Sequence, residues 1–222
     1  MTGRGAILAA DDPFVRLAGH PEAWTGGGYE VRMELPRLGM VARRALLRRL
    51  WRHPALDGPY LSAGSVALGA PLRTWARADL NTLALPSCLW GQATLPGGAQ
   101  TTFSTYTFTY EAKTWLYFGL PLGGLNSLAG LPVGAFPFED GRPLDWRAEV
   151  DAWLCDVARW VHAAHPVRLA LVGWIDSHDD PTAASVAADG VPDERWVGFL
   201  VPGADGTLDW HGPNQGSPVR LG

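Results

Sequence analysis

The sequence predicts one α+β domain, in which a mainly antiparallel sheet carries two amphipathic helices on one face. Residues 29–35 alternate strictly between apolar and charged side chains, which is the pattern of a half-buried strand. Residues 40–53 and 146–165 instead repeat their apolar side chains at helical spacing. Because the chain has 222 residues and 47% of them are hydrophobic, we expect residues 1–222 to share a single core.

The remaining strands are expected in the middle and at the end of the chain. Residues 89–120 contain three extended stretches that are separated by turns at 96–98 and 111–113, which predicts three antiparallel strands. Residues 167–175 are apolar on both faces, as in a central strand, and a hairpin that turns at 202–206 follows.

The order strand, helix, strand occurs twice, and both helices end at a His-Pro pair. This suggests two β-α-β halves that form a split, ferredoxin-like layer with added strands. The segments between these elements lack a lasting periodicity. We therefore expect residues 1–24 to form an N-terminal arm, and residues 63–88 and 119–143 to form long covering loops.

Composition excludes several classes of function. A net charge of −4 and a single lysine argue against broad nucleic-acid binding. No apolar run approaches the length of a membrane span, and the early run at residues 6–10 is too short for a secretory signal, so we expect a cytoplasmic protein. The glycine-rich stretches match no phosphate-binding or dinucleotide-binding motif, and we expect no cofactor.

A cluster of acidic residues and an imidazole follows the expected central strand. Asp176, His178 and Asp179 are candidates for acid/base catalysis, and Asp176 and His178 are candidates for metal binding. Neighbouring side chains in an extended chain diverge, so a metal ion would need a further ligand from elsewhere. His162, His165 and His211 are the histidines that could supply it. The alternative is a solvated turn, in which Asp180 and Pro181 begin a helix and no metal binds.

An arginine stripe is the second candidate. Arg44, Arg48 and Arg52 recur at helical spacing on the face opposite the apolar residues of the first helix. Like charges at this spacing repel one another, so the stripe gains from an acidic counterpart. It therefore predicts a surface that binds an anion or an acidic partner, with an ordinary solvated helix face as the alternative.

The two cysteines predict little chemistry. Two are too few for a disulfide scaffold, and whether Cys88 and Cys155 pair is left open. Cys155 and His162 lie two helical turns apart, which is too far for a thiol and an imidazole to act together. Cys155 is therefore expected either on the surface or buried under a loop.

We interpret the chain as a non-catalytic, bacterial, protein-binding domain. The chain contains 11 tryptophans, among them Trp24, Trp75, Trp90 and Trp210, most of which are expected to cover the core. Its acidic, tryptophan-rich character is like that of immunity proteins that neutralise toxins. Either the threonine-bearing strand 105–109 or the acidic segment 176–180 is the expected contact patch. The alternative is a small metal-dependent or acid/base hydrolase with its site at the end of the 168–175 strand.

Overall fold

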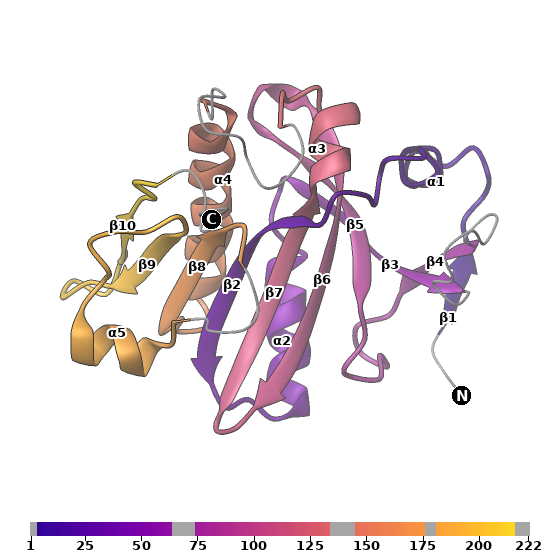
Figure 1. Cartoon of the computed structure of the whole chain (residues 1–222). Helices are drawn as coiled ribbons and strands as arrows, with labels where there is room; N and C mark the ends of the chain where they lie inside the picture. The colour runs from indigo at the N-terminus through magenta and orange to yellow at the C-terminus, as the bar shows by residue number, and fades with distance from the viewer. Residues whose placement is uncertain (1–3, 64–73, 134–144, 176–180, 216–222) are drawn as a thin grey trace.

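The computed structural model describes residues 4–63, 74–133, 145–175 and 181–215. These residues form an α+β structure around a ten-stranded antiparallel sheet of order β1-β4-β3-β5-β6-β7-β2-β8-β9-β10 (Figure 1). The strands are β1 (Arg4–Ile7), β2 (Gly28–Pro36), β3 (Leu56–Ala63), β4 (Thr74–Ala78), β5 (Leu89–Thr94), β6 (Gln100–Tyr110), β7 (Lys113–Pro121), β8 (Leu169–Gly173), β9 (Gly198–Pro202) and β10 (Leu208–His211). The helices are α1 (Pro13–Ala18), α2 (Met40–Leu50), α3 (Leu122–Ser127), α4 (Asp145–His162) and α5 (Ala183–Asp189), with a 3-10 turn at Pro96–Gly98.

Strand β2 lies inside the sheet between β7 and β8, and its alternation decides what faces the core. The odd-numbered side chains of this strand are at most 1% exposed and join the main hydrophobic cluster; they are Tyr29, Val31, Met33 and Leu35. The predicted strand is confirmed, but it is buried on both faces and not on one, since Glu30 and Glu34 are 4% and 1% exposed. Its charged residues point to the opposite face of the sheet.

The two long helices, α2 and α4, lie behind the sheet in Figure 1 and cover the core. They are joined by a reciprocal contact. The Nε of Arg49 on α2 donates to the carbonyl of Trp160 at 2.8 Å, and the Nε1 of Trp160 donates to the carbonyl of Arg49 at 2.8 Å. The guanidinium carbon also lies 3.6 Å from the centre of the indole ring. A cation–π contact and two hydrogen bonds therefore fix one helix against the other.

Two short helices cover the opposite face at its two ends. On one side, Phe14 of α1, which was not predicted, packs in a cluster with Tyr60, Trp75 and Trp90 of the strands and with Trp24. On the other side, Val186 of α5 packs against Leu169 and Leu171 of β8 and Phe199 of β9. The centre of this face, over β2, β7 and β6, lies between the two clusters.

Several expectations need correction. The expected arm at 1–24 contains β1 and α1, the expected loop at 63–88 contains β4, and the expected loop at 119–143 contains α3. In each case four to six residues form an element that is too short for periodicity to reveal. The two ferredoxin-like halves are not confirmed, since β2 and β3 are separated by three strands.

The orientation of the threonines of β6 is also the reverse of the expectation, which placed them on a contact surface. Thr105 and Thr107 are fully buried on the helix side, opposite Phe118 and Leu116 of β7. Thr105 satisfies its hydroxyl by donating to the carbonyl of Tyr117 at 2.6 Å. Because α2 and α4 cover this side, the threonines lie inside together with Phe103, and Tyr106, Phe108 and Tyr110 of the same strand lie on the open side.

We expect Arg49→Lys to lower the free energy of unfolding by about 1–2 kcal/mol, because lysine loses both the planar stacking on Trp160 and the Nε donor. Denaturant unfolding measures this change. The matched control is Arg52→Lys at an exposed position just after α2, where we expect less than about 0.5 kcal/mol. Equal effects in the two variants would show that the contact between α2 and α4 contributes nothing specific.

Candidate functional site

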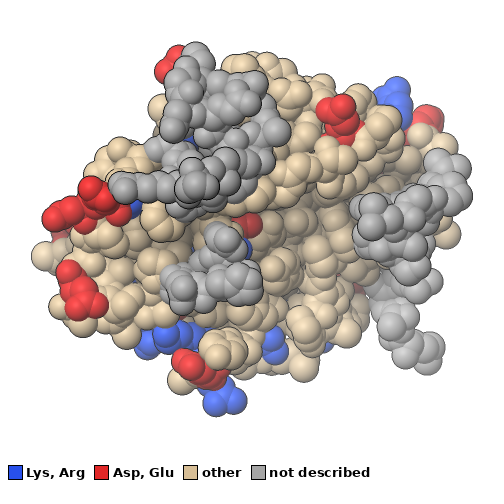
Figure 2. Space-filling model, viewed as in Figure 1, with Lys and Arg blue, Asp and Glu red and all other residues tan. Residues whose placement is uncertain are grey.

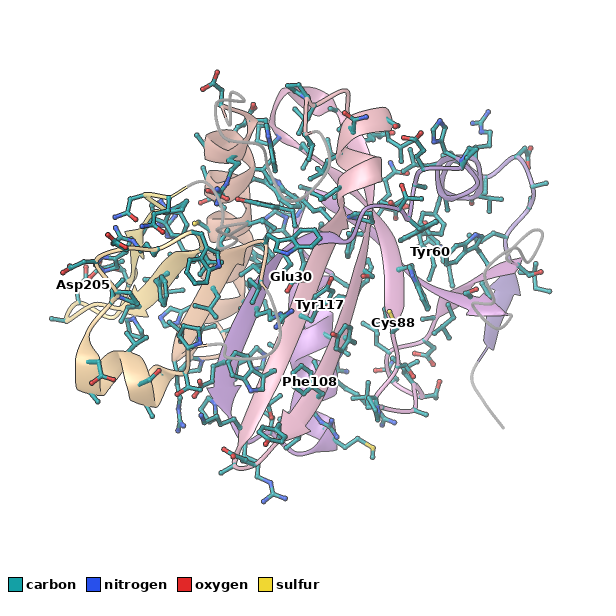
Figure 3. The ribbon with its side chains drawn as sticks, in the orientation of Figure 1. Glu30, Tyr60, Cys88, Phe108, Tyr117 and Asp205 are labelled. Atoms are coloured by element: carbon teal, nitrogen blue, oxygen red, sulfur yellow. The ribbon has the colours of Figure 1, made fainter. Side chains whose placement is uncertain are left out.

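The centre of the sheet face opposite α2 and α4, where the described residues place no helix, is the first candidate surface. We call it the open face, and its central side chains come from three adjacent strands: Glu30, Arg32 and Glu34 on β2, Trp115 and Tyr117 on β7, and Tyr106 and Phe108 on β6. Figure 3 shows Glu30, Tyr117 and Phe108 on this side of the ribbon. Cross-strand partners point the same way, so Arg32 lies opposite Tyr117 and Glu34 lies opposite Trp115, whereas Glu30 lies opposite Gly119.

The rings of the open face stack across the strands. Tyr106 and Tyr117 lie 4.6 Å apart between ring centres and are tilted by 22°. Phe108 and Trp115 form a second, looser pair at 6.5 Å. Phe108 is 36% exposed and Tyr110, at the end of the same strand, is 65% exposed. Aromatic surface therefore reaches solvent on this side of the sheet.

The carboxylates of the open face are paired with cations. The Nε of Arg32 lies 2.5 Å from a carboxylate oxygen of Glu30, and Glu30 is only 4% exposed. Lys113 lies 3.9 Å from Glu34, whose Oε2 also accepts the backbone N–H of Ala183 at the start of α5. Such pairing offsets the cost of removing these charges from water.

Tyr117 packs closely against the polar centre. A side chain at Gly119 would approach the Tyr117 hydroxyl to 2.2 Å, and one at Gly28 would approach it to 2.7 Å, so both glycines make room for this ring. Burial, the charge of Glu30 and a hydrogen bond to Glu30 raise the pKa of Tyr117. The phenol therefore stays protonated and serves as a hydrogen-bond donor rather than a base.

The predicted acid/base and metal site begins at the rim of the open face. The Nη2 of Arg32 donates to the carbonyl of Ile175 at 3.1 Å, just beyond the end of β8. Asp176, His178, Asp179 and Asp180 lie outside the described residues. Helix α5 begins two residues later than in the alternative reading, which began a helix at Asp180 and Pro181. Its N-cap is Thr182, whose hydroxyl accepts a hydrogen bond from the backbone N–H of Ser185.

A metal centre finds no support in the described part of the chain, where no three histidine, cysteine or acidic side chains are grouped as metal ligands would be. Of the histidines considered as helpers, His162 is already engaged. Its Nδ1 accepts the backbone N–H of Val167, and its Nε2 lies 3.0 Å from the carbonyl of Gly206. The imidazole thus holds two backbone segments together.

The arginine stripe is partly occupied by the chain itself. Arg44 donates through Nε and Nη2 to the carbonyl of Leu83, and Arg48 donates to the side-chain oxygen of Asn81 at 2.9 Å. Arg52 is exposed. Binding of an anion or acidic partner by Arg44, Arg48 and Arg52 remains a prediction. Two of the three guanidinium groups already donate hydrogen bonds to residues 81–83.

Both cysteines are free thiols. Cys155 is 2% exposed, and burial raises its pKa to about 12. A thiol with this pKa carries almost no thiolate at neutral pH and is a poor nucleophile. Cys88 is half-buried near the start of β5, on the open side of the sheet (Figure 3).

A second polar cluster, on the helix side of β2, was not predicted. Tyr29 donates its hydroxyl proton to Oδ1 of Asp151 at 2.5 Å, and the Nε of Arg147 donates to the Tyr29 oxygen at 2.9 Å. All three residues are at most 6% exposed. Burial raises the pKa of Asp151 to about 6, against the lowering effects of Tyr29 and Arg147. A buried carboxyl that titrates near neutrality is a common feature of functional sites.

The chain is an α+β protein with an aromatic open face and a buried Tyr29–Asp151–Arg147 cluster. A scan against protein-family models and searches of curated proteins and solved structures found no match. Within the described residues, no helix has both the length and the apolar character that crossing a bilayer demands.

We expect Asp151→Asn to be more stable than the wild type at pH about 7, by about 1–3 kcal/mol. The folded pKa of Asp151 lies above its ordinary value, so ionisation favours the unfolded state. The stability of the wild type should therefore fall as pH rises from about 4 to about 6, and remain lower above that range. The two proteins should converge near pH 4.

Denaturant unfolding across this pH range measures the effect. Glu149→Gln, which removes an exposed carboxylate from the same helix, is the matched control and should follow the wild type. An Asp151→Asn curve parallel to that of the wild type would mean that Asp151 titrates with an ordinary pKa.

Proposed function

We propose that this chain is a non-catalytic protein-binding domain and that the open face is its contact surface. In its narrowest form the proposal is an immunity-like protein that neutralises a toxin. One observation carries the proposal: Phe108, which stacks on Trp115, and Tyr110 at the end of the same strand reach solvent on this face, at 36% and 65% exposure.

The composition of the open face supports this proposal. Interface residues that contribute most to affinity are enriched in tryptophan, tyrosine and arginine, and they lie in well-packed patches. Tyr106, Tyr117 and Arg32 are partly exposed and provide two of these residue types, and they lie beside the buried Trp115. Because the rings are already ordered by stacking, a partner would lose little side-chain entropy on binding them.

The charges of this surface indicate the chemistry of the partner. Glu30 and Glu34 are each paired with a cation of the same face. In Figure 2, most of the coloured Lys, Arg, Asp and Glu side chains lie around the border of the view. Such a surface is complementary to a weakly charged protein segment rich in apolar or aromatic residues, and not to an acidic or basic one.

A metal-dependent or acid/base hydrolase at the end of β8 is the second candidate. Its supporting observation is that Glu30, a nearly buried carboxylate, is bonded to Arg32, which also binds the carbonyl of Ile175. A stoichiometric divalent ion in the purified protein, lost in both Asp176→Ala and His178→Ala, would favour this candidate over the binding domain.

We expect Phe108→Asp to abolish recovery of a stoichiometric partner when the tagged protein is used as bait in lysate of its own cells. The new carboxylate would lie unpaired in the interface, which typically costs more than about 2 kcal/mol. Val41→Asp is the matched control, because Val41 is exposed on α2, behind the sheet. Recovery of the bait alone by the wild type would contradict the binding domain, and loss of the partner only in Val41→Asp would place the contact on the helix face.

A further inference from the structure

A cavity of about 570 Å³ lies between α4 and the end of the described chain. One wall is the polar side of α4, and the other is formed by β10 and the residues after it. The lining residues are Arg147, Ala148, Asp151, Ala152, Cys155, Arg159, Trp210, Gly212, Pro213, Asn214 and Gln215. This volume is in the range of pockets that bind small molecules. The cavity lies on the helix side of the sheet, away from the open face.

Asp151 has an unfilled acceptor position at this cavity. Its Oδ1 accepts the Tyr29 hydroxyl proton, whereas its Oδ2 accepts no hydrogen bond from the described residues. Asp151 is only 5% exposed to solvent. A carboxylate oxygen so placed gains strongly from a donor that enters the cavity.

The cations that line the cavity already have partners. Arg147 donates to the Tyr29 oxygen at 2.9 Å and to the carbonyl of Trp196 at 2.8 Å. Arg159 lies 3.3 Å from the carboxylate of Asp156, one turn away on α4. Among the charged groups of the lining, Oδ2 of Asp151 is therefore the atom without a hydrogen bond from the described residues, and a ligand that binds it must bring a donor.

The rest of the lining favours an apolar body on that ligand. The indole of Trp210 lies flat against Gly198 of β9, where a side chain would approach it to 1.8 Å. Ala148 and Ala152 lie on successive turns of α4 and leave space because they carry only a methyl group. An apolar body would contact Trp210 while its polar end reaches Asp151.

We propose that this cavity binds a small organic amine, whose ammonium group donates to Oδ2 of Asp151 and whose apolar body lies against Trp210. The ammonium supplies a donor for Oδ2 and a positive charge in addition to that of Arg147. The inference concerns a different surface from the open face and does not depend on the proposed protein-binding function.

Binding of an amine depends on the ionised form of Asp151. The titratable or charged groups that face this carboxyl are Tyr29 from β2 and Arg147 and Cys155 from α4. The pKa of Tyr29 and the pKa of Cys155 are both raised well above neutrality, and that of Asp151 is about 6. Asp151 is therefore the group whose titration should change affinity between pH 5 and 8.

Isothermal titration of the full chain with phenethylamine tests the proposal, with phenethyl alcohol and phenylacetate as probes of the same body but different charge. We expect phenethylamine to bind at pH about 7.5 and to bind about tenfold more weakly at pH about 5, where about one Asp151 in ten remains ionised. The alcohol and phenylacetate should bind at least about tenfold more weakly than the amine at pH about 7.5.

Two variants, each of which removes one negative charge, test whether the amine binds at Asp151. Asp151→Asn keeps an acceptor for Tyr29 and should lose phenethylamine binding at both pH values, while its cooperative unfolding shows that it is folded. Glu149→Gln, on the same helix but outside the cavity, should bind like the wild type. Equal affinity of Asp151→Asn and wild type, stronger binding of phenylacetate than of the amine, or no binding of phenethylamine up to about 10 mM would each overturn the proposal.

Discussion

The opposite orientation of successive side chains on β2 is the constraint on which both polar sites depend. Tyr29 points to the helices and joins Asp151 and Arg147, whereas Glu30 points to the open face and joins Arg32 and Tyr117. Strand β2 is hydrogen-bonded to β7 along one edge and to β8 along the other. This pairing fixes its register and therefore which face of the sheet Tyr29 and Glu30 occupy. A shift of one residue would bring a charged side chain into the core and Tyr29 out of it.

The helices decide which side of the sheet remains open. The reciprocal bonds of Arg49 and Trp160 fix α2 against α4, and the leucines of α2 fill the space beneath β6 and β7. Phe103 and Phe118 fill the closed side, and the remaining rings of β6 and β7, Tyr106, Phe108, Trp115 and Tyr117, lie on the other side. Their stacking then makes an ordered surface at no further cost in backbone structure.

The sequence predicted the long elements well. The strict alternation of 29–35 and the apolar stripe of α4 identified the central strand and the main helix. In a long element, packing of one face against the core requires apolar residues at regular spacing, and this spacing is visible in the sequence. The elements β1, α1, β4 and α3 were missed because each has four to six residues, which is too few to show a period, and α5 was anticipated only by the alternative of a helix that begins at Asp180 and Pro181. Their positions come from contacts with distant strands.

The candidate sites were harder to predict for a related reason. Tyr29 lies more than a hundred residues before Arg147 and Asp151 in the chain. It meets them only when α4 packs on β2. Nothing local marks Asp151 as different from the exposed carboxylates of the same helix. On β6 the alternation itself was visible, but alternation alone does not state which of its two sides the helices will cover.

The two edges of the sheet limit how another chain can associate with this one. The edge strands β1 and β10 contain four residues each, so they offer an incoming strand only a few backbone groups. Extending the sheet by one more strand is thus a poor route to a complex, and the same shortness protects the molecule against end-to-end aggregation. Recognition has to proceed through side chains on the flat surfaces, where a single substitution alters specificity without disturbing the hydrogen-bond ladder of the sheet.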